Sequence, residues 1–533
     1  MKKSVLIVFP FLVGLILLVY SWYSSYPLSI NSVNDYVFNH VSISYWIALP
    51  LVLGSLYFAA MSVKSRVLKW IVTVTMVIMM FSLPYFYYML PGSDSHQFRG
   101  LTEYYIKTSD LKPVKPYHEY YEWPLFFLLE KTATSLTGLT LQQFEFILYA
   151  VIGLLLATAL FKYSSNNGEE RSFVAVLSFF IAMYYFLNYQ NVPFSLSLAF
   201  LFVLFMLEKS IYNGNHSGYT KTVITLIIFT SMTFTHLFVP LFFVLYLLVK
   251  YALTRNRREF TLFLATGAIY LAVQIFQAPV SFEENLRVLM KYANPEYGSL
   301  LQQTLAPVSF QIDIVAQLFS RIVVLSAIAI CVYGFILLWS RKQLTSVDKA
   351  IFISGATYSA IGFAVPILGS RAIAVTFIPV TLGAAYLFRN KHKKVVEGLF
   401  LVLLVLFLFI PFHISFDDSQ IVFQTKEAYT TENFMIDHYN WNNSNLVLGH
   451  FRVIGYLNAR QKGSTYFDSD SSDLFPRAIK YDCMVFTVGL EKSLLRHNVT
   501  MEESITKRKL DLVYSNGASN IAVSSVPREI GQQ

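Results

Sequence analysis

Long apolar runs dominate this sequence and most limit the folds open to it. Hydrophobic windows mark thirteen segments, most of them near the ~20 residues that a helix needs to cross a ~30 Å hydrocarbon core. These segments are 4–21, 43–62, 67–90, 146–162, 172–188, 193–208, 222–235, 237–252, 261–280, 316–340, 350–367, 372–388 and 396–414. Only 14% of the 533 residues are charged, well below the roughly 25% of soluble domains. The sequence therefore predicts an all-α polytopic membrane protein with about thirteen transmembrane helices.

The distribution of Lys and Arg predicts how these helices are oriented. Basic residues collect in the cytoplasmic loops of membrane proteins. If the N-terminus is cytoplasmic, every inner loop carries Lys or Arg, and several outer connections carry neither. We therefore expect a multi-pass protein of the cell membrane, with a cytoplasmic N-terminus and an extracytoplasmic C-terminus. This pattern explains most of the formal net charge of +9, so the charge does not indicate nucleic-acid binding.

The chain divides into a membrane part and a polar tail. Residues 1–414 form the predicted transmembrane domain, with outer loops at 91–142 and 281–315, and residues 415–533 form an extracytoplasmic domain. In the tail, NLVLG, TYF, CMVFTV and NIAVSS read as strands, while FRVIGYLNAR and EESITKRKLDL read as helices. A small α/β domain is expected. Cys331 and Cys483 are the chain's two cysteines, which excludes a disulfide or a cysteine-based metal site within the tail.

The outer loop 91–142 concentrates charge in a chain that otherwise avoids it. Its first half carries Asp94, His96, Arg99 and Glu103, and its second half begins with His118, Glu119 and Glu122. Asp94 precedes LTEYYIK in the manner of a helix N-cap. Farther on, WPLFFLLEKTATSLTGL spaces its leucines as a helix that lies along the outer membrane surface would. This loop is therefore the first place to look for chemistry.

The layout of these segments resembles the GT-C superfamily of membrane glycosyltransferases. Three features of the loops carry the resemblance: the acidic Asp94 just after a span, the surface helices of loop 91–142, and a second outer loop at 281–315. A fourth is the segment GSRAIAVTFIPVTLGAAYLF, which has Arg371 and Pro379 near the start of a late span. Within the superfamily, the layout is similar to the protein O-mannosyltransferase and lipid A aminoarabinose transferase branches. In the tail, DLVYSNGASNIAV resembles a closing strand pair of archaeal members. The resemblance implies sugar transfer from a polyprenyl (dolichyl) phosphate donor on the outer face.

Two departures from the family narrow this implication. The Trp-Trp-Asp signature of oligosaccharyltransferase catalytic subunits is absent from the tail, where the nearest text is HYNWNNSN. Transfer of a whole glycan to protein asparagine is therefore not expected. Asp94 is followed by Ser95 instead of the Glu that protein O-mannosyltransferases carry, so any second acid must come from elsewhere in the loop.

The chemistry of sugar transfer assigns roles to the charged residues. A hydroxyl acceptor needs a nearby base, and a departing phosphate needs donors or positive charge. Asp94 is the predicted catalytic base. Six further residues are predicted to bind substrate, the two arginines through their planar fork of donors to phosphate: Arg371, Arg321, His236, His96, Glu119 and Glu122. No cofactor and no metal ligand are assigned, although a divalent cation stays open.

Each of these residues also has a plain structural interpretation. Asp94 can be read as a helix N-cap with no catalytic role. His236 can be read as a side chain that hydrogen-bonds backbone groups between two spans. Glu119 and Glu122 fit solvated interface charges, and Arg371 fits a side chain that reaches for lipid headgroups. His96 can be read as an ordinary histidine at the membrane interface.

Three classes of function stay open at this point. The leading hypothesis is an inverting glycosyltransferase with a polyprenyl-phosphate-linked sugar as donor and a lipid-linked glycan, a lipid or a protein as acceptor. A transporter or flippase of lipid-linked glycans is the first alternative, and it should show polar or broken helices near the midplane. An outer-face glycan polymerase or ligase is the second. In the predicted topology, the ionisable residues lie at the outer mouths of the spans, with few near the midplane. This distribution favours the transferase.

Overall fold

The computed structural model describes most of the membrane part and five strands of the tail. The described residues are 2–27, 40–63, 65–86, 95–108, 122–165, 172–183, 192–212, 218–279, 283, 314–364, 366–388, 397–398, 400–407, 446–449, 465–468, 483–487, 510–515 and 519–524. The helices are α1 (Lys2–Ser25), α3 (Ile43–Ser62), α4 (Arg66–Met80), a 3-10 turn η1 (Leu83–Phe86), α5 (Ser95–Thr108), α6 (Leu125–Thr137), α7 (Leu141–Ser164), α8 (Ser172–Ala182), α10 (Pro193–Tyr212), α11 (Gly218–Thr233), α12 (Val239–Thr254), α13 (Arg257–Phe276), α16 (Ile314–Ser340), α17 (Ser346–Ala364), α18 (Pro366–Val380) and α19 (Leu382–Leu387).

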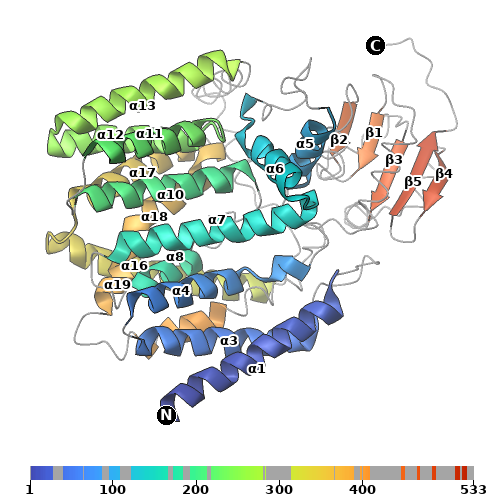
Figure 1. Cartoon of the computed structure of the whole chain (residues 1–533), viewed down its shortest axis with the longest axis horizontal. Helices are drawn as coiled ribbons and strands as arrows, with labels where there is room; N and C mark the ends of the chain where they lie inside the picture. The colour runs from blue at the N-terminus through green and yellow to red at the C-terminus, as the bar shows by residue number, and fades with distance from the viewer. Residues whose placement is uncertain are drawn as a thin grey trace.

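Every predicted apolar segment contains described helix. Segment 43–62 has the same bounds as α3, and segment 372–388 covers the end of α18 and all of α19. Among the described residues, six helices are long and apolar enough to cross a membrane, and three shorter apolar helices accompany them. The protein is therefore a multi-pass helical membrane protein (Figure 1). That all thirteen segments cross the bilayer stays a prediction.

The packing separates a protein-facing core from an exposed apolar surface. All residues of α8 are buried, as expected for a helix that is apolar all round and lies inside a bundle. By contrast, α1, α13 and α16 expose large apolar side chains, among them Tyr23, Phe276 and Leu325. Because soluble proteins rarely expose extensive apolar surface, these helix faces suit contact with lipid.

Interhelical contacts show which helix ends lie together. Ion pairs join the C-terminal ends of α10 and α12 to the N-terminal ends of α13 and α17. The predicted topology assigns all these ends to the inner side. Helices α5 and α6 lie at the opposite end of α7 and α10 (Figure 1). We call that end the outer end and the other the inner end. Which of them faces the cytoplasm stays a prediction.

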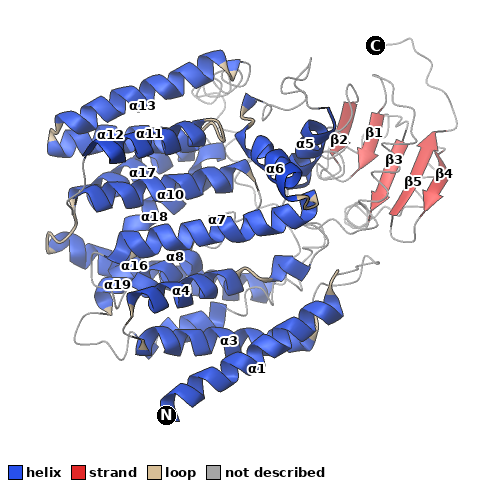
Figure 2. Ribbon diagram, in the orientation of Figure 1, coloured by secondary structure: helices blue, strands red, loops and turns tan. Residues whose placement is uncertain are grey.

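The tail contributes a mixed sheet, and the described strands all belong to it (Figure 2). Its strands are β1 (Leu446–Gly449), β2 (Thr465–Asp468), β3 (Cys483–Thr487), β4 (Leu510–Ser515) and β5 (Ser519–Ser524), in the order β2-β1-β3-β5-β4. Strands β2 and β3 run parallel to β1, whereas β5 is antiparallel to both β3 and β4.

Sequence reasoning finds the strands but misplaces one boundary. The segments NLVLG and CMVFTV contain β1 and β3, and the segments TYF and NIAVSS cover β2 and β5 except for one residue each. The predicted helix EESITKRKLDL is wrong in its last residues, because Leu510–Ser515 pairs with β5 as β4. A short apolar run gains ladder hydrogen bonds that local helical periodicity does not anticipate. The predicted helix FRVIGYLNAR lies outside the described residues, so the α/β character of the tail stays a prediction.

Candidate functional site

Helix α5 of the outer loop is anchored to span α7 by a buried arginine. Arg99 donates from Nη1 to Glu145 Oε2 at 3.0 Å and from Nε to Glu103 Oε1 at 3.2 Å. The side chains of Arg99 and Glu145 are 6% and 7% exposed. Because α7 begins only at Leu141, Glu145 lies in its first two turns, and the ion pair holds α5 against the outer end of the bundle.

Helix α6 is joined to α5 by polar and aromatic contacts. Thr102 donates a hydrogen bond to the buried Glu130. Lys131 Nζ donates to the carbonyl oxygen of Tyr105 at 2.9 Å, and the Tyr105 ring stacks on Phe127 with centroids 5.7 Å apart. The two helices therefore form one packed unit.

Helix α6 is the helix predicted from the leucine spacing, but it ends before Leu139. The helix stops at Gly138, whose φ of 70° is easily reached by glycine alone. Leu139 therefore belongs to the link to α7, although leucine spacing had extended the helix over it. Leu136 is 81% exposed and Leu129 is 38% exposed, so the outward face is apolar, as a helix at a membrane surface requires.

The turn between α11 and α12 lies against the outer loop. The Leu125 amide donates to the Phe234 carbonyl oxygen at 3.2 Å, which ties the start of α6 to this turn. His236 is 1% exposed, and its Nδ1 accepts a hydrogen bond from the Phe238 amide at 3.1 Å. In the neutral imidazole the proton then sits on Nε2. His236 thus satisfies a backbone group, and its predicted contact with substrate stays a prediction.

The predicted site residues fall into two groups. Asp94 and Glu119 lie outside the described residues, as does His118. The backbones of His96 and Arg371 lie on α5 and α18, but their side chains are not described. The structure therefore leaves these roles as predictions.

Glu122 and Arg321 are described in full. Glu122 is half-buried in the short 3-10 turn that leads into α6. Arg321 is exposed on α16, beside the exposed Ile322 and Leu325. Of the predicted site residues with described side chains, Glu122 precedes α6 in the chain and His236 lies two residues after Phe234, which bonds the start of α6; among the described contacts none joins Arg321 to either. Arg321 lies instead on an apolar surface suited to lipid.

A metal site finds no support in the described part of the chain. Among those residues, no group of three or more His, Cys, Asp or Glu side chains is placed to hold a metal ion. Carboxylates at the outer end are engaged with protein donors: Glu145 with Arg99, and Glu130 with Thr102.

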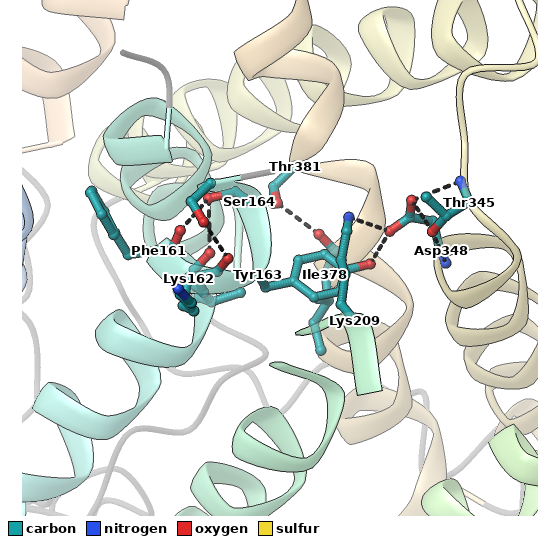
Figure 3. A network of polar contacts seen from close by, with 11 residues as sticks. Phe161, Lys162, Tyr163, Ser164, Lys209, Thr345, Asp348, Ile378 and Thr381 are labelled. Carbon is teal, nitrogen blue, oxygen red and sulfur yellow. Dashed lines mark hydrogen bonds and ion pairs between the residues drawn. The ribbon is translucent and has the colours of Figure 1, made fainter. Parts of the chain in front are cut away.

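The inner end holds a polar network that sequence reasoning missed. Lys209 Nζ lies 2.7 Å from Asp348 Oδ1, and both side chains are at most 2% exposed. Tyr163 donates to the same carboxylate, and Thr345 Oγ1 donates to Asp348 Oδ2 at 2.7 Å. As Figure 3 shows, the network brings together α7, α10 and the start of α17.

A second buried cluster adjoins it on α10. Lys250 Nζ pairs with Glu208 and lies 2.9 Å from Glu259 Oε1. Arg258 lies 3.6 Å from Glu208 Oε1. Because Glu208 and Lys209 are adjacent and buried, α10 is tied on one side to α12 and α13 and on the other to α7 and α17. Ionisable residues thus lie buried at both ends, and the expectation that they sit at the outer mouths was incomplete.

Comparisons with known proteins identify distant structural likenesses and no family. No protein-family model matches this sequence, and neither does the sequence of any curated protein. Among solved structures, the chain is similar to ArnT from Cupriavidus metallidurans bound to undecaprenyl phosphate, with a TM-score of 0.39 and 11% identity over 87% of this chain and 98% of that one.

Proposed function

We propose that this protein is an inverting, membrane-embedded glycosyltransferase that moves a sugar from a polyprenyl-phosphate donor to an acceptor hydroxyl at the outer end. The observation that carries the proposal is the buried Arg99–Glu145 pair. It fixes α5 on α7, and Asp94 directly precedes Ser95, the first residue of α5. The GT-C-like layout of the sequence is the second support.

The proposed reaction is a single displacement at the anomeric carbon. The Asp94 carboxylate accepts the proton of the acceptor hydroxyl while that oxygen forms the new glycosidic bond. The bond between the anomeric carbon and the phosphate oxygen breaks, and polyprenyl phosphate leaves with the electron pair. Arginine donors would stabilise the departing phosphate, and Arg371 and Arg321 are the proposed ones.

The exposed surface of α16 suits the lipid part of the donor. Ile322 and Leu325 are exposed beside Arg321, so an isoprenoid chain could lie on apolar side chains with its phosphate near a guanidinium. This arrangement uses an arginine at the membrane boundary, where a basic side chain can reach the headgroup level. Arg321 would then meet the donor from the lipid side.

The inner end favours a transferase over a transporter. Transport requires the substrate site to open in turn to both sides of the membrane. The described inner ends of α7, α10, α12, α13 and α17 are joined by buried ion pairs and hydrogen bonds. Opening them would separate charges that have no water to solvate them. A site that opens only at the outer end agrees better with these contacts.

Asp94→Asn is expected to reduce sugar transfer by about 100-fold to 10,000-fold, because the amide cannot accept the acceptor's proton. The measurement is transfer of labelled sugar from polyprenyl-phosphate donors by the full-length protein in proteoliposomes. Asp110→Asn, the same change elsewhere in the outer loop, is the control and should retain activity. Undiminished transfer by Asp94→Asn would remove the assigned base, and movement of the intact donor lipid without transfer would favour a flippase.

A further inference from the structure

The turn between α12 and α13 gathers basic residues at the inner end. Arg255, Arg257 and Arg258 stand within four successive positions. Arg258 lies within 4.0 Å of the buried carboxylates of Glu208 and Glu259. Arg255 and Arg257 are exposed, and among the described residues no carboxylate pairs with either of them. Two positive charges at this turn are therefore available to a ligand.

Backbone contacts fix the turn without using the side chains of these two arginines. The Arg255 amide donates to the Tyr251 carbonyl oxygen at 2.7 Å, and Arg255 has a φ of 55°. Asn256 caps α13 by accepting a hydrogen bond from the Arg258 amide at 3.0 Å. Helix α13 therefore begins at Arg257, and the positive end of its dipole lies at the same turn. The helix dipole adds to the attraction that the arginines exert on an anion.

Arg257 stands at the inner end of an exposed apolar stripe along α13. At 3.6 residues per turn, it lies on the same side of the helix as the exposed residues that follow. The large apolar members of the stripe, which are between 40% and 81% exposed, are Phe260, Leu264, Leu271, Ile275 and Phe276. Small residues lie between them: Ala268 and Ala272 are exposed, and a Cβ on Gly267 would meet nothing within 4 Å. From Phe260 to Phe276 the stripe extends for about 24 Å at ~1.5 Å per residue.

We propose that this side of α13 binds an anionic phospholipid, with its phosphate at Arg255 and Arg257 and an acyl chain along the stripe. A guanidinium presents a fork of donors that matches phosphate oxygens. The acyl chain would cover apolar side chains that no part of the protein covers. A free phosphate satisfies only the arginines, and a neutral lipid brings no net negative charge to them. Anionic lipids also attract basic residues at the cytoplasmic surface, which is where the predicted topology places this turn. The site does not depend on the proposed sugar transfer.

The experiment measures lipid binding to the delipidated full-length protein in an uncharged detergent by native mass spectrometry. The probes are phosphatidylglycerol, which is anionic, and phosphatidylcholine with the same acyl chains. Wild type should bind phosphatidylglycerol at least about 10-fold more tightly. Arg255→Gln/Arg257→Gln should weaken that binding about 25-fold, since a basic residue near a membrane surface contributes roughly 5-fold. Binding of phosphatidylcholine should not change.

Lys162→Gln is the matched control. Lys162 is an exposed cation in the last turn of α7, at the same end of the bundle. The turn before it carries no exposed apolar stripe, because Thr158 is half-buried and accepts a hydrogen bond from Trp70 Nε1 at 3.0 Å. Loss of this charge should change the affinity for phosphatidylglycerol by less than about 2-fold. Without lipid, all variants should keep the thermal midpoint of wild type, because the changed side chains are exposed.

Three results would overturn the inference. Equal affinity of wild type and Arg255→Gln/Arg257→Gln for phosphatidylglycerol would show that the two arginines do not hold the phosphate. An equal loss in Lys162→Gln would reduce the effect to a general attraction between a basic surface and an anionic lipid. Glycerol phosphate, the headgroup without chains, should not displace the lipid at 100-fold excess. If it does, the arginines bind free phosphate and the stripe on α13 plays no part.

Discussion

Lys250→Met is expected to lower the free energy of unfolding by about 3–5 kcal/mol, the usual cost of removing one partner from a buried ion pair. The Lys250 ammonium lies between the carboxylates of Glu208 and Glu259, and the side chains of all three are at most 5% exposed. Its removal leaves two buried negative charges near one another, with the partly exposed Arg258 close to both. The measurement is unfolding by SDS in mixed micelles, followed by tryptophan fluorescence.

The rescue of this variant tests the physical cause. Lys250→Met combined with Glu208→Gln and Glu259→Gln removes all three charges, and it should recover at least half of the lost stability because no unpaired charge stays buried. Arg257→Met, an exposed basic residue at the start of the same α13, should change stability by no more than about 0.5 kcal/mol. Equal effects of Lys250→Met and Arg257→Met would contradict a buried charge cluster.

These inner clusters mark the limit of what the sequence could reveal. Periodicity and length place the helices well, because burial in lipid imposes apolar runs of a set length. Counting Lys and Arg, however, treats Lys209 and Lys250 as loop charges. Helix α10 continues to Tyr212, so Lys209 lies within the helix and meets Asp348, 139 residues away. A partner at that sequence distance has no local signal.

In the outer loop, too, the helices could be predicted from the sequence, whereas the contact between distant residues could not. The helical spacing in 95–108 and 125–137 was readable, but the leucine spacing carried the second helix past Gly138, where α6 ends. The pairing of Arg99 with Glu145 was not, because the predicted segment begins at 146 and leaves Glu145 one residue outside it. A buried acid at the end of a span is itself a signal that a base must lie nearby. That rule would have pointed to one of the loop's basic residues.

Two glycines allow α16 and α19 to approach closely in the described bundle. A Cβ on Gly334 of α16 would lie 2.1 Å from the carbonyl oxygen of Gly383, and a Cβ on Gly383 would lie 2.1 Å from that of Cys331. Both obstacles are backbone atoms, which cannot turn aside as side chains do. Neither glycine has a positive φ, so glycine is needed here for the close approach of α16 and the helical turn around Gly383.

Gly334→Ala and Gly383→Ala are each expected to cost about 3 kcal/mol or more, because an added methyl group must push two backbones apart. The same SDS unfolding assay measures the loss, and poor recovery of folded protein would point the same way. Gly267 on α13 provides the matched control, since a Cβ there would meet nothing within 4 Å. Gly267→Ala should leave stability unchanged or raise it by up to about 1 kcal/mol through higher helix propensity. If Gly334→Ala proved as stable as Gly267→Ala, α16 and α19 could not cross as closely as described.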